Sequence, residues 1–249
     1  MPRFTLTHFF HEVFHAFTHA DKGIFYLLKE LLLRPGIVAR EYIAGKRKKY
    51  FNPFTFFLIL AAFYVLSESF KVSVNHVNKG VPTEITRIEN LQDRNDATAI
   101  YNRAIKTQLF FTKHGNVIAM IAVPFFAFYF WVLFYRRKYN FSEHLVANLM
   151  FVSFANLAFS LLVFPLQALL KDTPYTQSVL FLGFLIQIIY FSMAYRGFLE
   201  LKGFWPTFKV TMATIIGLML WGFLTQLLSA IYVYQNLNFM EYFKHMFGR

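Results

Sequence analysis

The chain has 249 residues, of which 57% are hydrophobic, 20% aromatic and only 15% charged. Soluble domains carry about a quarter charged residues, so the composition excludes an ordinary soluble fold and indicates an integral membrane protein. The absence of cysteine excludes disulfides, thiolate zinc sites and cysteine nucleophiles. The net charge of +12 lies beside apolar runs, which indicates attraction to anionic lipid headgroups rather than to nucleic acid.

Residues 1–52 are expected to form a cytoplasmic interfacial region, here called the collar, built from short amphipathic helices. Residues 5–19 place phenylalanines on one side of a helix and histidines on the other. A second helix over 24–33 is too short and too charged to cross a bilayer, and a Pro–Gly pair ends it. A third is expected over 37–45. Such helices lie in the membrane interface.

The histidine face of the first helix contains a zinc-protease pattern. His11 and His15 lie one helical turn apart with Glu12 between them, so both imidazoles can bind one zinc ion while the carboxylate deprotonates its water. His19 or Asp21 offers a third ligand. A solvated polar face is the simpler interpretation, because all these histidines fall on the polar side. Incidental zinc binding without catalysis is a third interpretation. Zinc is thus a cofactor only under the hydrolase interpretation, and otherwise none is expected.

A block of cations precedes the first apolar run. Four adjacent cations at a cytoplasmic interface gain about 1 kcal/mol each from an anionic leaflet. Two interpretations stand: the block fixes the topology, or it recognises a lipid headgroup or a polyphosphorylated substrate. The candidate headgroup-binding residues are Arg34, Arg40, Lys46, Arg47, Lys48 and Lys49.

Five apolar runs follow, each suited to a hydrocarbon layer that takes roughly 20 helical residues to cross. Asn52 is a good N-cap and Pro53 a good first residue for the first of them. The fold class is therefore all-α, with a five-helix transmembrane domain over 53–234. A polar loop over 71–114 is expected to hold two amphipathic helices, and residues 235–249 form a short tail. The spans are expected at about 53–70, 115–135, 145–169, 178–195 and 207–233.

Lys and Arg counts set the expected orientation. The first 52 residues carry nine, and the turns at 136–144 and 196–209 carry three each, whereas the turn at 171–177 carries one. The positive-inside rule places the N-terminus in the cytoplasm, and the C-terminus and the 71–114 loop on the other side of the membrane. The seven basic residues of that loop oppose this orientation, although four acidic residues accompany them.

Polar residues follow one another along the third span. His144 and Asn148 lie one helical turn apart, and polar groups in lipid are costly enough to need partners. One interpretation is a helix cap with interhelical hydrogen bonds. The other is a transport path completed by Gln187 or Gln226. The stripe consists of Glu143, His144, Asn148 and Asn156.

Two further patterns near span ends predict packing. Arg196 and Glu200 are four residues apart and are expected to pair. Ala213 and Gly217 form a small-xxx-small patch, which lets a neighbouring helix approach closely.

Two stretches resemble a known bacterial family. The first contains Arg34-Pro35-Gly36, Arg40-Glu41-Tyr42, Gly45-Lys46-Arg47, Tyr50 and Pro53, and the second contains Tyr139-Asn140-Phe141 and Glu143-His144-Leu145-Val146. Together they resemble the membrane family labelled domain of unknown function 3667. The resemblance implies a multi-pass inner-membrane protein and no particular activity. Many such proteins begin with a Cys-rich zinc ribbon, which a chain without cysteine lacks.

The function indicated most strongly is non-enzymatic: a membrane scaffold, accessory subunit or lipid-interacting component of a larger assembly. Interfacial and packing features are numerous, whereas convergent catalytic groups are few. The expected partners are anionic lipids and other membrane proteins, not nucleic acid. Two other classes stay open, namely a small transporter or channel that uses the polar stripe and a membrane-associated zinc hydrolase that uses His11, Glu12 and His15.

Overall fold

A computed structural model describes residues 23–75, 81–170 and 173–235, whose regular structure is entirely helical. The histidine-rich helix predicted over 5–19 lies outside the described residues. The all-α membrane fold is confirmed. In chain order the helices are residues 23–33, α2 (Pro35–Ile43), η1 (Arg47–Lys49), α3 (Pro53–Asn75), α4 (Thr83–Thr86), α5 (Leu91–Lys113), α6 (Gly115–Leu133), α7 (Phe141–Ala158), η2 (Phe159–Val163), α8 (Phe164–Leu169), α9 (Thr176–Phe198) and α10 (Phe204–Tyr234).

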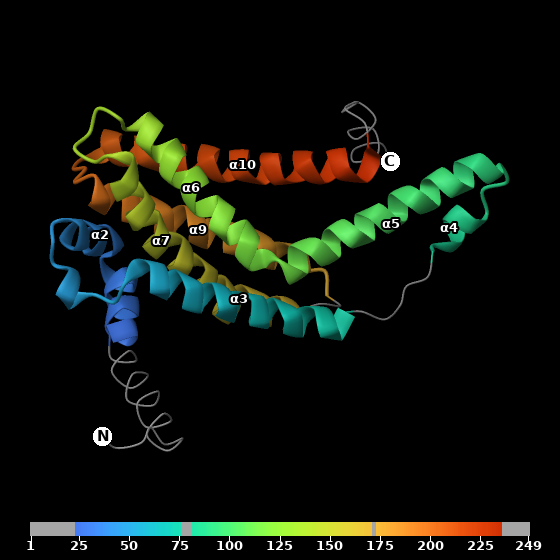
Figure 1. The fold of residues 1–249 in the computed structure, drawn as a ribbon, viewed down its shortest axis with the longest axis horizontal. Coiled ribbons are helices and arrows are strands. Elements are labelled where there is room, and N and C mark those ends of the chain that lie inside the picture. The colour runs from blue at the N-terminus through green and yellow to red at the C-terminus, as the bar shows by residue number, and fades with distance from the viewer. Residues whose placement is uncertain (1–22, 76–80, 171–172, 236–249) are drawn as a thin grey trace, which may run out of the picture.

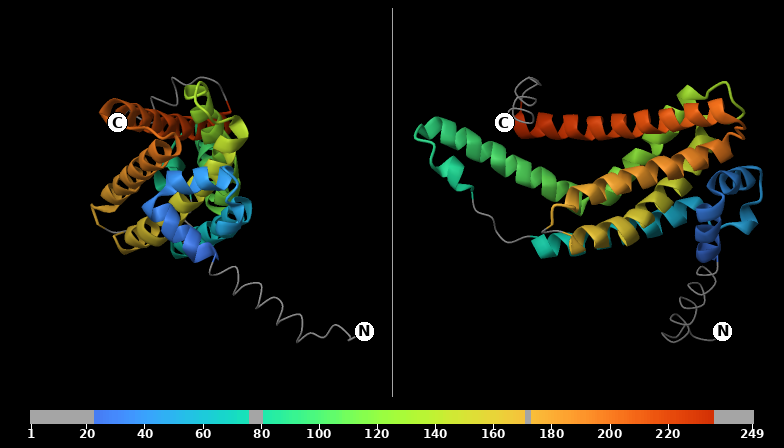
Figure 2. Two further views of the ribbon diagram at one scale, coloured as in Figure 1. Left: turned by 90° about the vertical axis from the view of Figure 1, so that its left-hand side faces the viewer. Right: turned by 180° about the vertical axis from the view of Figure 1, so that it is seen from behind.

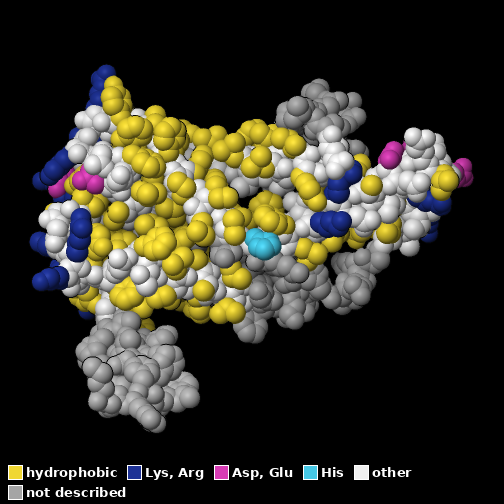
Figure 3. All heavy atoms as spheres, in the orientation of Figure 1, with side chains coloured by type: hydrophobic (Ala, Val, Ile, Leu, Met, Phe, Trp, Pro, Cys, Tyr) yellow, Lys and Arg dark blue, Asp and Glu magenta, His cyan; other side chains and the backbone are white. Residues whose placement is uncertain are grey.

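Helices α3, α6, α7, α9 and α10 form a bundle along the long axis of the molecule (Figure 1 and Figure 2). The end that carries the 23–33 helix, α2 and η1 is called the collar end. The opposite end, which carries α4 and α5, is called the distal end. Figure 3 shows hydrophobic side chains over the middle of the bundle, with Lys and Arg side chains towards both ends. A bilayer-spanning bundle presents such a banded surface.

Four helices are long and apolar enough to cross a membrane. They are Arg47–Ser67, Phe141–Leu169, Thr176–Phe198 and Phe204–Tyr234. The remaining predicted span corresponds to a shorter apolar helix, Val117–Leu133. This helix is part of α6, whose 19 residues cover about 28 Å at a rise of 1.5 Å per residue, within the length range of a membrane span. The protein is therefore a multi-pass helical membrane protein.

The span Phe141–Leu169 changes its geometry just before a proline. Helix α7 passes into the π-helical turn η2 and then into α8, whose second residue is Pro165. In a regular α-helix the proline ring would collide with the carbonyl group of Leu161. The wider π-turn accommodates this conflict, so the span continues to Leu169 instead of ending at the proline.

Two helices, α4 and α5, lie between the first two spans, in the loop where two were predicted. In the structure Leu91 begins α5, because the Asn90 side chain caps that helix by accepting the Gln92 backbone N–H at 2.9 Å. Helix α5 packs against α10, where Arg103 Nε donates to the Val233 carbonyl oxygen at 2.6 Å.

The small-residue patch of α10 packs against α6, as predicted. A Cβ atom at Gly217 would lie 2.7 Å from Cε1 of Tyr129. The Tyr129 hydroxyl donates to the Ala213 carbonyl oxygen at 2.9 Å. The missing side chain therefore leaves room for an aromatic ring, whose polar end is satisfied by the neighbouring helix backbone.

The short helix α2 belongs to the bundle rather than resting beside it on the membrane. Val38 and Ala39 are fully buried, and α2 packs against α9 and α7. Pro35 begins α2, where its missing N–H costs nothing. The interfacial position predicted for the collar therefore does not apply to α2, which connects the 23–33 helix and the basic turn to the spans. For those two parts it stays a prediction.

Candidate functional site

The 23–33 helix exposes an apolar face at the collar end. Its Leu27 is fully buried against the bundle. On the opposite side Phe25, Leu32 and Leu33 are 68%, 59% and 63% exposed, with the exposed Lys29 among them, whose charged end can reach the headgroups. Such a face is unfavourable in water and favourable in the interfacial layer of a bilayer. This helix therefore has the surface that an interfacial position requires.

Glu41, near the end of α2, ties the basic turn to that helix. Its Oε1 accepts a hydrogen bond from Lys46 Nζ at 3.2 Å. Its Oε2 accepts from Lys49 Nζ at 2.8 Å and from the Tyr50 hydroxyl at 2.5 Å. The hydrogen bonds from Lys49 and Tyr50 lower the pKa of the Glu41 carboxyl group to about 2. Lys46 and Lys49 thus have a structural role that their charge pattern alone does not reveal.

The other cations of the basic block lie open. Arg47 and Lys48 are exposed, and the Arg47 guanidinium lies 6.0 Å from the centroid of the Tyr42 ring. Lys46 keeps 60% of its side chain exposed despite its contact with Glu41. The basic block therefore exposes positive charge to its surroundings while Glu41 holds it against α2.

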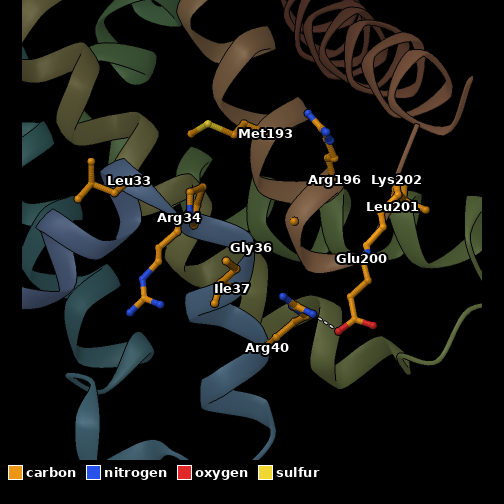
Figure 4. Close-up of a pocket in the computed structure, with 12 residues that line it drawn as sticks. Leu33, Arg34, Gly36, Ile37, Arg40, Met193, Arg196, Glu200, Leu201 and Lys202 are labelled. Atoms are coloured by element: carbon orange, nitrogen blue, oxygen red, sulfur yellow. Dashed lines mark hydrogen bonds and ion pairs between the residues drawn. The ribbon is translucent and has the colours of Figure 1, made fainter. Parts of the chain in front are cut away.

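Arg34 and Arg40 lie in a pocket between the start of α2 and the end of α9 (Figure 4). The pocket, here called the α2–α9 pocket, has a volume of about 780 Å³. Arg196 and Lys202 also line it, as does one carboxylate, that of Glu200. Four cations against one carboxylate give the pocket a positive potential.

The α2–α9 pocket lies where two helix backbones touch. A Cβ atom at Gly36 would lie 2.2 Å from the Phe198 backbone nitrogen and 2.3 Å from the Ala194 carbonyl oxygen. A Cβ atom at Gly197 would lie 3.2 Å from Gly36 Cα. Backbone atoms cannot yield as a flexible side chain can, so this contact requires glycine at Gly36. The flanking side chains of the two helices form the pocket walls.

Glu200 forms an ion pair with Arg40, 160 residues away in sequence. The predicted pair between Glu200 and Arg196 is therefore wrong. An i,i+4 pair needs continuous helical geometry, but α9 ends at Phe198. Glu200 lies beyond that end in left-handed backbone, with φ of 55°.

The turn at Glu200 has the hydrogen bonds of a Schellman motif. The Glu200 N–H donates to the Gly197 carbonyl oxygen at 3.4 Å, and the Leu201 N–H donates to that of Arg196 at 3.0 Å. Glycine is the usual residue at this position, and a left-handed conformation costs other residues roughly 1–2 kcal/mol. The ion pair with Arg40 gives a physical reason for a glutamate here.

The four cations of the pocket differ in how they are paired. Arg34 Nε donates to Glu30 Oε2 at 2.6 Å, and Arg40 pairs with Glu200. Arg196 and Lys202 are exposed and form no ion pair with any residue that the structure describes. The uncompensated charge of the pocket therefore lies on the α9 side.

Two members of the polar stripe meet inside the bundle, away from this pocket. His144 and Asn148 are fully buried, and Asn148 Nδ2 donates to the Tyr195 hydroxyl at 2.5 Å. The His144 ring centroid lies 5.9 Å from that of Tyr195 and 5.3 Å from that of Phe198. Neither His144 nor Asn148 lines the α2–α9 pocket or the cavity between α5 and α10. The geometry is that of one interhelical hydrogen bond, from Asn148 to Tyr195, among aromatic rings, while the ring nitrogens of His144 have no hydrogen-bond partner among the described residues.

The other residues weighed with the stripe are dispersed. Glu143 forms a reciprocal capping box with Asn140 at the start of α7, with backbone-to-side-chain distances of 3.0 and 2.7 Å. Asn156 is half-buried about three and a half turns further along the same helix. Gln226 lines the α5–α10 cavity, while Gln187 is half-buried in α9. The proposed transport residues therefore do not share one cavity.

The zinc candidates His11, Glu12, His15 and His19 lie outside the described residues. Within the part of the chain that the structure describes, no three His, Asp or Glu side chains gather into a metal site. Zinc binding by the N-terminal helix stays a prediction.

The collar also carries the likeness to known proteins. Residues 21–65 match the family model "Protein of unknown function (DUF3667)". The family resemblance is confirmed over this DUF3667 segment, which runs from the collar into α3. No curated protein and no solved structure matches the chain. The DUF3667 segment contains Arg34, Gly36, Arg40 and Glu41, hence the α2 wall of the pocket, while the α9 wall lies beyond it.

Proposed function

We propose that the protein is a lipid-interacting component of a bacterial inner membrane, with its collar end on the cytoplasmic side. One observation carries the proposal: an exposed apolar helix face and exposed cations share the same end of the bundle. Phe25, Leu32 and Leu33 supply the apolar face, and Arg47 and Lys48 supply cations.

The apolar helix face and the exposed cations favour neighbouring regions of an anionic membrane, namely the acyl-chain boundary and the headgroup layer. An apolar helix face is stabilised between headgroups and acyl chains. A cation near an anionic leaflet gains about 1 kcal/mol. Because both gains require the same placement of the collar end, they act together to hold it in the interface.

The other two function classes gain less support from the described residues. A transport path along the polar stripe would need His144 and Asn148 to face a cavity, and both are enclosed beside Tyr195. A zinc hydrolase would depend on residues outside the described ranges.

Lipid selection by the purified protein tests the proposal. The protein is reconstituted in nanodiscs of equal phosphatidylcholine and phosphatidylglycerol, and the lipids that remain bound after mild extraction are counted by native mass spectrometry. We expect enrichment in phosphatidylglycerol, which falls with rising salt. The variant Arg47→Ala/Lys48→Ala should lose part of this enrichment.

The matched control is Arg87→Ala/Lys106→Ala, which removes two exposed cations at the distal end. It should leave the enrichment unchanged. Equal losses from both double variants, or no enrichment in the unaltered protein, would contradict the proposal.

A further inference from the structure

The α2–α9 pocket differs from the rest of the basic surface because it is concave. A volume of about 780 Å³ lies within the range of pockets that enclose a small molecule. Figure 4 shows Arg34 and Arg40 on the α2 side, with Arg196, Glu200 and Lys202 on the α9 side. The Arg40 side chain points towards Glu200, while those of Arg34 and Arg196 point away from each other, so the cations border the hollow from two elements without meeting at one point.

The charges of the pocket favour an anion with several oxygen acceptors. Arginine presents a planar fork of N–H donors, which fits a phosphate group. Arg196 and Lys202 have no carboxylate partner among the described residues. The Nε of Arg40 is buried and has no hydrogen-bond partner within the described structure, so the charge that an anion can reach lies mainly on Arg196 and Lys202.

The remaining walls are apolar and indicate a lipid rather than a free anion. Leu33 and Met193 line the pocket and are 63% and 42% exposed. Met193 lies about one helical turn further into the bilayer than Arg196. Ile189, one turn beyond Met193, is 67% exposed. An apolar strip of α9 therefore leads from the membrane-facing surface to the cations.

We propose that the α2–α9 pocket binds one phospholipid by its phosphate group, with Arg196 and Lys202 as the principal contacts and Leu33 and Met193 against the start of an acyl chain. The preferred lipid has an exposed phosphate with no attached cationic group, because the pocket itself supplies the positive charge. This inference rests on the proposed function, since the pocket meets headgroups only if the collar end lies at the interface.

Glu200 has a defined part in this site. Its carboxylate pairs with Arg40 and therefore competes with an incoming phosphate for the same guanidinium. Loss of that negative charge should therefore strengthen phosphate binding, whereas loss of the cations should weaken it.

Binding of a single lipid by the full chain tests the site. Detergent-purified protein is titrated with phosphatidic acid, and the one-lipid complex is quantified by native mass spectrometry. We expect one tight complex with phosphatidic acid and none of comparable affinity with phosphatidylcholine. Arg196→Ala/Lys202→Ala should weaken it at least about tenfold, since two charge-assisted contacts are lost. The charge-conserving variant Arg196→Lys/Lys202→Arg should keep most of the affinity, and Glu200→Gln should raise it.

Three controls distinguish a lipid site from a general effect of charge and from a site for free phosphate. Arg87→Ala/Lys106→Ala, at the distal end, should bind phosphatidic acid as the unaltered protein does. Leu33→Gln/Met193→Gln should weaken the binding of phosphatidic acid. Glycerol 3-phosphate should displace the lipid from the unaltered protein only at a concentration far above that of the lipid. Displacement by glycerol 3-phosphate at equal concentration would show a site for a free phosphate and overturn the lipid assignment.

The inference and the proposed function fail in different ways. Unchanged binding by Arg196→Ala/Lys202→Ala, while phosphatidylglycerol enrichment persists, would overturn the pocket and leave the function in place. If the unaltered protein showed no enrichment in phosphatidylglycerol, the proposed function and the pocket would both be overturned.

Discussion

Gly36 of α2 and Gly197 of α9 lie in backbone contact, with a Cβ placed at Gly197 only 3.2 Å from Gly36 Cα. This contact joins the DUF3667 segment to the end of a span more than 150 residues later in the chain. It fixes the distance between the two basic walls of the α2–α9 pocket. The position of Arg40 relative to Arg196 therefore depends on two residues that carry no charge.

Gly36→Ala should destabilise the protein strongly. Its Cβ would meet the Phe198 backbone nitrogen, and overpacking of this kind costs about 1–3 kcal/mol. A lowered melting temperature in detergent, followed by intrinsic fluorescence, checks the expectation. Gly222→Ala is the matched control, because nothing lies within 4 Å of a Cβ there and alanine favours a helix. Equal melting temperatures for the two variants would show that the helices do not touch at Gly36.

The Glu41 cluster should make stability sensitive to acid. The pKa of Glu41 is lowered in the folded protein to about 2, from an ordinary value of 4.5. A depressed folded-state pKa stabilises the fold above the unfolded pKa, and this contribution is lost as the pH falls from about 4.5 towards 2. The melting temperature of the unaltered protein should therefore exceed that of Glu41→Gln at pH 6, with a gap that narrows through this window. A gap that stays constant at every pH in the window contradicts the ion cluster.

The buried hydrogen bond between Asn148 and Tyr195 should couple α7 to α9. Tyr195→Phe leaves the amide of Asn148 without that partner, at a cost of about 1–3 kcal/mol. Asn148→Leu should then cost less in the Tyr195→Phe background than in the unaltered protein. A double-mutant cycle of unfolding free energies measures this coupling. Strictly additive effects would mean that the two side chains do not interact.

The spans could be predicted from the sequence because they depend on local features. Apolar run length, the Asn52–Pro53 start and the capping residues around Glu143 each act within one or two helical turns. Helix α6 likewise begins at Gly115, where the polar sequence of α5 gives way to an apolar run.

The pocket could not be predicted, because its pairings are remote in sequence. Spacing alone favours Arg196 as the partner of Glu200, while the left-handed turn after Phe198 brings Glu200 to Arg40 instead. From the sequence, the cations at 196–209 predict only which side of the membrane this turn faces, and not a pocket. Nothing in a linear pattern pairs Gly36 with Gly197.

The orientation of the collar end is the central claim, and the lack of cysteine makes it directly measurable. Single cysteines are introduced as Lys48→Cys at the collar end and Glu89→Cys at the distal end, both at exposed positions. Intact cells are then treated with a membrane-impermeant maleimide. The account predicts that Glu89→Cys is labelled in intact cells and Lys48→Cys only after the membrane is opened. Labelling of Lys48→Cys in intact cells, with Glu89→Cys protected, would contradict it.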